Sequence, residues 1–243
     1  MNISNVARSL SDALLATLLA PTCAACDRSL DDPTHGPVCG GCWRSIVPFT
    51  PPLCDVCGDP LLSWRILNRQ CPRCRRSRSQ ITRARAIGEY DGALRAIIHA
   101  LKYGGRRSLA RPLATRIATY AGEALSGADV AVPVPLHRSR RRQRGFNQAA
   151  DIARHLPLPM WDALRRIKAT VSQTGLPALE RQANVEEAFA VRDAPHVIDR
   201  IVVLVDDVCT TGATLDACAR VLLDAGAREV RAVTAARVAA QSR

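Results

Sequence analysis

The sequence predicts an α/β fold, with a central, mostly parallel sheet flanked by helices, preceded by a small Cys₄ zinc-ribbon domain. Residues 201–205 are all apolar and four of them are β-branched, which is typical of a strand buried on both faces of a parallel sheet. A Thr- and Gly-rich turn and an apolar helical stripe follow this strand. Four Cys-x-x-Cys pairs before residue 80 indicate the metal-binding part.

Length and charge narrow the class of protein. The 243 residues suffice for one domain of moderate size and a small one. The net charge of +12 favours anionic partners such as nucleic acid or pyrophosphate. No run approaches the ~18 apolar residues that indicate a membrane span. Cysteines in metal-type pairs imply reduced thiols, so we expect a cytoplasmic protein without a membrane span.

Residues 1–20 are predicted to form an amphipathic helix, because leucines recur there at helical spacing. Arg8 ahead of an apolar stretch is weakly similar to a signal peptide. Asp12 and Thr17 interrupt that stretch, and the zinc-type cysteines argue against export, so the helix is the preferred interpretation.

The cysteine pairs predict a zinc-ribbon domain over residues 21–80 with two closed, structural zinc sites. Sequential pairing of the four pairs gives two ribbons, and interleaved pairing gives a cross-braced unit. Sequential pairing is favoured because each ribbon closes only a short loop. The predicted zinc ligands are Cys23, Cys26, Cys39, Cys42, Cys54, Cys57, Cys71 and Cys74.

Arginines concentrate at the end of this domain, at Arg69, Arg73, Arg75, Arg76 and Arg78. Counterion release rewards such a cluster on nucleic acid. No aromatic residues for base stacking accompany it, so a solvated surface is the alternative.

Residues 81–243 are expected to form the α/β domain. A strand is predicted at 86–90, and two helices follow, with apolar stripes from Leu94 to Leu101 and from Leu109 to Tyr120. Residues 102–107 between them form a basic loop broken by glycines, which either contacts substrate or is a solvated turn. Later in the chain, a helix ending at Gly226 and a last strand at 229–234 are predicted.

A second anion-binding segment follows the strand predicted at 129–135, which prolines close. Five arginines lie within residues 136–148, and guanidinium groups suit phosphate oxygens. A helix reaching Leu156 is expected next. Residues 170–190 either form a lid that includes Arg181, a candidate phosphate ligand, or merely connect two strands.

The clearest site signal is the acidic pair Asp206 and Asp207, expected where the buried strand ends, at the sheet edge where ligands bind. The turn after it feeds a helix, whose N-terminus is an anion site. Carboxylates beside a phosphate cradle suit a ligand with hydroxyls and phosphate, such as a ribose 5-phosphate. The turn consists of Thr210, Thr211, Gly212, Ala213 and Thr214. Cys209 before it is predicted to be a small buried residue.

The run Val-Asp-Asp-Val-Cys-Thr-Thr-Gly-Ala-Thr resembles the 5-phosphoribosyl-1-pyrophosphate (PRPP) motif of type I phosphoribosyltransferases. The resemblance implies that fold, with loop amides on the 5′-phosphate, the acidic pair at the ribose hydroxyls and Mg²⁺ bound with PRPP. It also implies a hood, expected around residues 86–106, that selects the acceptor. By this resemblance the expected catalytic residues are Asp206, Asp207 and Arg181. The arginines expected to bind phosphate with the turn are Arg138, Arg140 and Arg144.

The Cys-x-x-Cys front end, the Leu-Lys-Tyr-Gly-Gly-Arg loop and the Arg-Gly-Phe-Asn-Gln run resemble the ComF family, known from DNA uptake and natural competence. The resemblance implies a phosphoribosyltransferase with an unknown acceptor and DNA-uptake proteins as partners. The alternative is a non-catalytic nucleotide-binding protein that handles single-stranded DNA.

Overall fold

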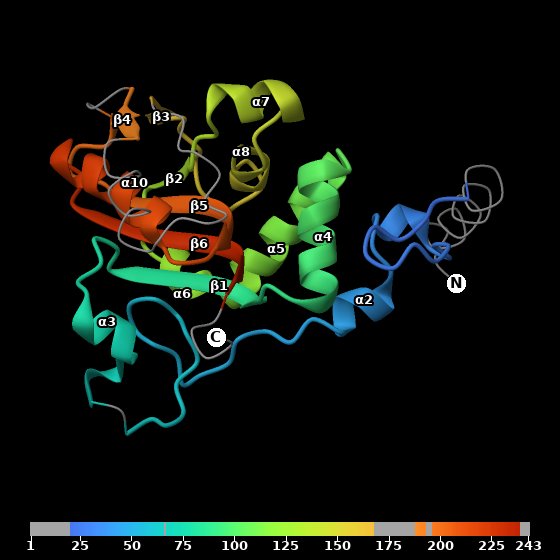
Figure 1. Ribbon diagram of the computed structural model, residues 1–243, viewed down its shortest axis with the longest axis horizontal. Coiled ribbons are helices and arrows are strands. Elements are labelled where there is room, and N and C mark those ends of the chain that lie inside the picture. The colour runs from blue at the N-terminus through green and yellow to red at the C-terminus, as the bar shows by residue number, and fades with distance from the viewer. Residues whose placement is uncertain (1–19, 66, 168–187, 193–195, 239–243) are drawn as a thin grey trace.

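The computed structural model describes residues 20–65, 67–167, 188–192 and 196–238, and every structural statement below concerns these residues. Its centre is a sheet of four parallel strands (Figure 1). In spatial order they are β1 (Arg83–Glu89), β6 (Glu229–Arg237), β5 (Ile201–Cys209) and β2 (Val130–Pro133). The predicted parallel α/β sheet is therefore confirmed.

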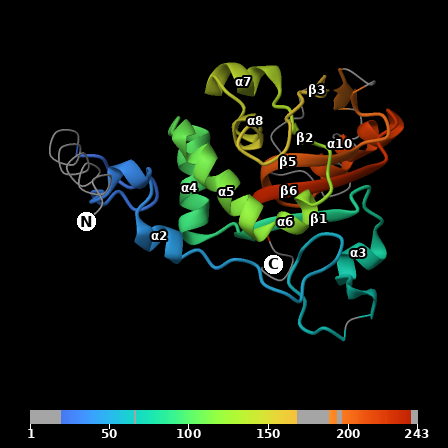
Figure 2. The ribbon, with the colours of Figure 1, turned by 180° about the vertical axis from the view of Figure 1, so that it is seen from behind.

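Helices cover both faces of the sheet (Figures 1 and 2). One face packs against α4 (Gly92–Tyr103), η3 (Arg107–Leu109), α5 (Ala110–Tyr120), α6 (Gly122–Leu125) and α8 (Gln148–Ala153). The other face packs against α10 (Ala213–Asp224) and the antiparallel strand pair β3 (Leu164–Arg166) and β4 (Phe189–Val191).

Side chains of β5 alternate between two cores, as strand geometry requires. Val203 and Val205 join the core under α4 and α5, whereas Val202 and Leu204 join the core under α10. All four are fully buried, which explains the continuous apolar run in the sequence.

Several predicted boundaries were wrong, and one helix was missed. β5 continues through Asp206 and Asp207 to Cys209, because backbone pairing with β6 extends that far. β6 likewise runs to Arg237, and α8 already ends at Ala153. The arginine segment of residues 136–148, for which no helix was predicted, contains the helix α7 (Arg138–Arg144).

The zinc-ribbon part forms two units that both contact the α/β domain. The first contains η1 (Pro33–His35) and α2 (Gly40–Arg44), and the second contains η2 (Leu67–Arg69) and α3 (Pro72–Arg76). The first lies beside α4 and the second beside β1 (Figures 1 and 2). Arg106 Nη1 donates to the Thr22 carbonyl over 2.9 Å, and Arg116 stacks 4.0 Å from the Trp43 ring centre. The domain limits at residues 20 and 80 stay predictions.

The free edge of β1 is covered by the zinc-ribbon chain. Phe49 N donates to the Ile87 carbonyl at 2.8 Å, and Ala84 N donates to the Val56 carbonyl at 2.6 Å. Two glycines permit this approach: a Cβ at Gly58 would lie 2.6 Å from Ala84 O, and one at Gly88 would lie 2.4 Å from Val47 O. The edge is therefore not available for pairing with another chain.

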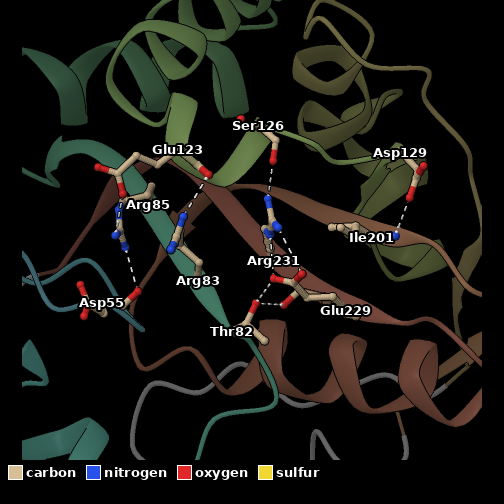
Figure 3. Close-up of polar contacts among 11 residues, drawn as sticks. Asp55, Thr82, Arg83, Arg85, Glu123, Ser126, Asp129, Ile201, Glu229 and Arg231 are labelled. Carbon is tan, nitrogen blue, oxygen red and sulfur yellow. Dashed lines mark hydrogen bonds and ion pairs between the residues drawn. The ribbon is translucent and has the colours of Figure 1, made fainter. Parts of the chain in front are cut away.

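Polar contacts tie the amino ends of the strands to α6 and to the second zinc unit (Figure 3). Arg85 donates to the Glu123 carboxylate over 3.0 Å and to the Asp55 carbonyl over 3.2 Å. Arg231 donates to the Ser126 carbonyl at 2.6 Å and pairs with Glu229 at 2.8 Å. These contacts hold the sheet at the edge opposite to the predicted ligand site.

Four further predictions concern the N-terminal helix, the lid, the hood and the absence of a membrane span. Residues 1–19 of the predicted N-terminal helix and most of the lid of residues 170–190, including Arg181, lie outside the described residues. The hood expected around residues 86–106 is wrong for the most part, because this range forms β1 and α4 within the core. Within the described residues no helix is both long and apolar enough to cross a membrane.

Candidate functional site

The acidic pair lies near the carboxyl end of β5. Because the strand continues through both residues, their side chains leave on opposite faces of the sheet. Asp207 reaches the α4 face, where its carboxylate lies 2.9 Å from Lys102 Nζ. Asp206 lies on the α10 face, and its Oδ1 accepts from Asp207 N at 2.8 Å.

Lys102 and Asp207 form a buried ion pair, with side chains 16% and 4% exposed. Burial acts to lower the pKa of Lys102, but the charge of Asp207 outweighs it and the pKa is raised. Asp207 Oδ2 is buried and has no hydrogen-bond partner among the described residues. One carboxylate oxygen thus remains for a further ligand.

Asp206 is an unusually weak acid. Burial and the neighbouring charge of Asp207 raise its pKa to about 7, against the opposing charges of Lys102 and Arg166. Like charges held close cannot both ionise easily. A cation or a hydroxyl-bearing ligand at this edge would favour the charged form.

The predicted phosphate turn leads into α10. Gly212 adopts φ 85° and caps the helix, a conformation that suits glycine. Thr211 Oγ1 accepts from Ala213 N at 3.4 Å. Thr210 and Thr211 are exposed, and Thr214 lies in the first turn of α10. Hydroxyls and the positive end of a helix of 12 residues are therefore available to an anion.

Helix α7 separates the arginines that were predicted to act together. Arg140 and Arg144 line a cavity of about 310 Å³ with Lys102 and Tyr103. Arg138 and Arg141 line a larger cavity of about 870 Å³. Gly145, at φ 77°, ends α7, and Asn147 Nδ2 donates to the Val134 carbonyl at 3.0 Å. The Arg-Gly-Phe-Asn-Gln run thus holds α7 beside the end of β2.

The larger cavity is strongly basic. Seven arginines line it against two aspartates, Asp151 and Asp162. Asp151 pairs with Arg107 at 2.7 Å and with Arg154 at 2.5 Å. The arginines are Arg107, Arg138, Arg141, Arg154, Arg165, Arg166 and Arg192.

The eight paired cysteines form two clusters in sequential order, as expected for two ribbons. Within each cluster the four sulfur atoms lie within 4.8 Å of one another. Cys26 and Cys39 Sγ are 3.9 Å apart, and Cys57 and Cys71 Sγ are 3.6 Å apart. Tetrahedral Zn–S bonds of ~2.3 Å require about 3.8 Å, so both clusters fit zinc. The first comprises Cys23, Cys26, Cys39 and Cys42, and the second Cys54, Cys57, Cys71 and Cys74.

Sequence reasoning missed two residues at this edge. Lys102 was predicted only as part of a basic loop. It is one of two lysines among the 34 Lys and Arg residues of the chain, and this rarity is the signal that could have singled it out. Arg237 pairs with Asp59 of the second zinc unit and donates to Cys209 Sγ at 2.9 Å. Cys209 is buried as predicted, but it is also a hydrogen-bond acceptor. No motif links residues 59, 209 and 237.

Two family models match the chain. A phosphoribosyl transferase domain covers residues 142–243, and a double zinc ribbon domain covers residues 14–75. With the parallel sheet and the two cysteine clusters, they define a phosphoribosyltransferase-fold protein that carries a double zinc ribbon with zinc sites.

Proteins of similar sequence show which family within this class the chain belongs to. Competence protein F of Haemophilus influenzae is 32% identical over 86% of this chain and 93% of its own. DNA utilization protein YhgH of Escherichia coli is 32% identical over 81% and 88%. Competence protein ComFC of Bacillus subtilis is 27% identical over 78% and 79%. The chain therefore belongs to the competence protein F (ComF) family.

Proposed function

We propose that this protein binds PRPP with Mg²⁺ and transfers the phosphoribosyl group to a nitrogen acceptor. The observation that carries the proposal is the meeting of three groups at one sheet edge: the acidic pair, the turn before α10, and Lys102 with Arg140 and Arg144. In this proposal the turn holds the 5′-phosphate and the arginines receive the pyrophosphate.

The donors at this edge suit Mg²⁺, which prefers carboxylate and phosphate oxygens. Asp207 offers an unpartnered oxygen, and Asp206 is half-buried beside it. When bound, the ion would neutralise part of the charge on the pyrophosphate.

The transfer needs no covalent intermediate with the protein. The bond from C1 to the pyrophosphate oxygen breaks and its electron pair leaves with pyrophosphate, while the nitrogen lone pair forms the new bond to C1 and the nitrogen releases a proton. The protein's part is to orient the two reactants and to stabilise the leaving charge.

Calorimetric titration of the zinc-loaded protein with PRPP and Mg²⁺ tests this proposal. We expect Asp206→Asn to weaken binding about tenfold or more, since one charge-assisted contact is worth ~1.5–3 kcal/mol. Asp224→Asn, which removes the same charge at the far end of α10, is the matched control. Equal affinity of the two variants would contradict the assignment. Pyrophosphate release that depends on Mg²⁺ would then identify acceptors.

A second function is supported by the cavity with seven arginines and by the names of the relatives, which refer to competence and DNA utilization. Here the protein would bind single-stranded DNA, with or without catalysis, together with other DNA-uptake proteins. Such binding falls steeply with salt. Binding of oligo-dT is measured by anisotropy at low and at physiological salt. The test variant is Arg138→Ala/Arg141→Ala, and a loss of oligo-dT binding in this variant distinguishes DNA binding from PRPP binding.

A further inference from the structure

One arginine of α7 is held in place by two neutral groups. We propose that Tyr103 and Gln148 are positioning residues, which hold the guanidinium of Arg144 ready for the leaving pyrophosphate without compensating its charge. This role rests on the proposed function, in which the arginines of α7 receive the pyrophosphate. Tyr103 ends α4 and Gln148 begins α8, so each comes from a different element than Arg144, which ends α7.

The guanidinium of Arg144 contacts an aromatic ring and an amide. Its Cζ atom lies 4.9 Å from the centre of the Tyr103 ring, and its Nη1 donates to Gln148 Oε1 over 3.2 Å. Gln148 is 3% exposed, so the surrounding core fixes its amide. A ring face and an amide oxygen attract a cation but carry no net charge. They therefore orient Arg144 and leave its positive charge available to a ligand.

The cavity of about 310 Å³ shows where this charge is available. Among its described lining residues three are cations, Lys102, Arg140 and Arg144, and none is acidic. Lys102 is already paired with Asp207 at 2.9 Å, so the two arginines supply the uncompensated charge. Arg140 is exposed, whereas Arg144 is half-buried. Because the side chain of Arg144 is already ordered, it loses less freedom than Arg140 when an anion binds.

Two arginines nearby are held in a different way. Arg107 and Arg154 both pair with the buried carboxylate of Asp151, at 2.7 Å and 2.5 Å. These ion pairs fix the side chains but compensate their charges. A carboxylate in place of Gln148 would do the same to Arg144. A neutral clamp therefore suits an arginine that must receive an anion, since donors oriented in advance stabilise a leaving charge best.

Tyr103 contributes little to the core. It is 64% exposed, and its ring centre lies 4.6 Å from that of His99 in the preceding turn of α4. A large aromatic side chain with this exposure adds little apolar burial to folding. Its substitution should therefore affect Arg144 without unfolding the protein, which makes it the better residue for a test.

Inorganic pyrophosphate with Mg²⁺ is the probe, and its affinity for the zinc-loaded full chain is measured by calorimetry. Tyr103→Leu removes the ring and should weaken binding about fivefold. Tyr103→Phe keeps the ring and should restore the affinity. Tyr120→Leu is the matched control, because Tyr120 is also an exposed tyrosine at the end of a helix but does not line the cavity. Wild-type affinity in Tyr103→Leu overturns the proposal.

A double variant tests whether the ring acts through the arginine. Arg144→Ala alone should weaken pyrophosphate binding about tenfold or more. Tyr103→Leu/Arg144→Ala should then show no further loss, because the ring has nothing left to orient. A further fivefold loss in the double variant contradicts the positioning role. Gln148→Glu keeps an oxygen beside Arg144 but adds a compensating charge, so it should also weaken binding, and unchanged affinity would contradict the need for a neutral partner.

Ribose 5-phosphate is titrated into the same proteins, because it reports the turn before α10 and not the pyrophosphate. Its affinity should change little in Tyr103→Leu. Equal losses for both ligands overturn the positioning role, since general damage to the site would explain them. A wild-type protein that binds no pyrophosphate overturns the proposed function together with this role. Wild-type binding that Tyr103→Leu leaves unchanged overturns the positioning role alone, so the two failures are distinguished.

Discussion

Asp206 and Asp207 are consecutive residues of a buried strand, so their carboxylates lie on opposite faces of the sheet but close enough that repulsion and lost hydration oppose their ionisation. Lys102 compensates Asp207 directly, whereas Asp206 keeps a pKa of about 7. The pair thus stores unfavourable energy in the ligand-free protein. A cation and ribose hydroxyls at this edge would relieve it.

The unfavourable ionisation of Asp206 beside Asp207 predicts that Asp206→Asn is more stable than the wild type, by an amount that depends on pH. The pKa of Asp206 is about 7 in the folded protein and near 3.8 when unfolded. The protonated form therefore favours folding, and the wild type loses stability as pH rises between these values. At pH 8 the variant should be more stable by about 2 kcal/mol, which allows for partial solvent contact. Chemical unfolding at pH 8 and pH 4 measures the difference, which should vanish at pH 4.

The ion pair predicts the opposite effect for Lys102→Met. Removing one partner of a buried pair leaves an uncompensated charge and costs about 3 kcal/mol or more. The free energy of unfolding from urea titration at pH 7 measures this cost. Lys102→Met/Asp207→Asn should recover most of it. A single variant as stable as the wild type would mean that the pair contributes nothing to folding.

At the scale of elements, β1 is an edge strand whose partner is an irregular segment of the zinc-ribbon part. Gly88 permits the approach of the Val47 carbonyl, and the bridge between Pro48 and Gly88 follows. Backbone contact at this distance leaves no room for a Cβ.

Gly88→Ala should release the segment around Phe49 from β1. The clash lies with backbone and has no flexible side chain to move, so we expect a loss of about 1–3 kcal/mol. Hydrogen exchange at the Phe49 amide, which donates to Ile87 O, reports the release. Gly122→Ala, which meets nothing within 4 Å, is the control and should leave exchange unchanged. Slow Phe49 exchange in Gly88→Ala would refute this account of the edge.

In the whole molecule, the two zinc units act at different places. The first packs on α4 and α5. The second supplies Asp59 to Arg237, which contacts Cys209 directly before the phosphate turn. The second unit is therefore coupled to the candidate site through one buried cation.

Matched ligand substitutions test this coupling. Cys42→Ser and Cys74→Ser each open one cluster and should each release one zinc ion per chain. Only Cys74→Ser should also weaken ribose 5-phosphate binding, by about tenfold, because it loosens the support of Arg237. Zinc content and calorimetric affinity measure both effects. Equal affinity losses would instead indicate general destabilisation.

Local patterns were enough to predict the parallel sheet, the sequential cysteine clusters and the turn before α10. A buried strand, a metal-binding knuckle and a glycine cap each leave a signature within a few neighbouring residues. Local patterns were less reliable at the ends of elements. β5 extends past its apolar run because β6 continues to pair with it, and the arginine segment contains a helix that the sequence did not predict.

Contacts between residues far apart in the chain could not be predicted from any local sequence pattern. Lys102 reaches Asp207 across 105 positions, and Arg237 joins Asp59 and Cys209 across 178 and 28 positions. The opposite directions of Asp206 and Asp207 likewise depend on how far pairing with β6 continues. Composition and spacing therefore identified which chemical groups the protein carries, whereas packing decided their partners, because burial and ion pairing depend on distances that only the folded chain defines.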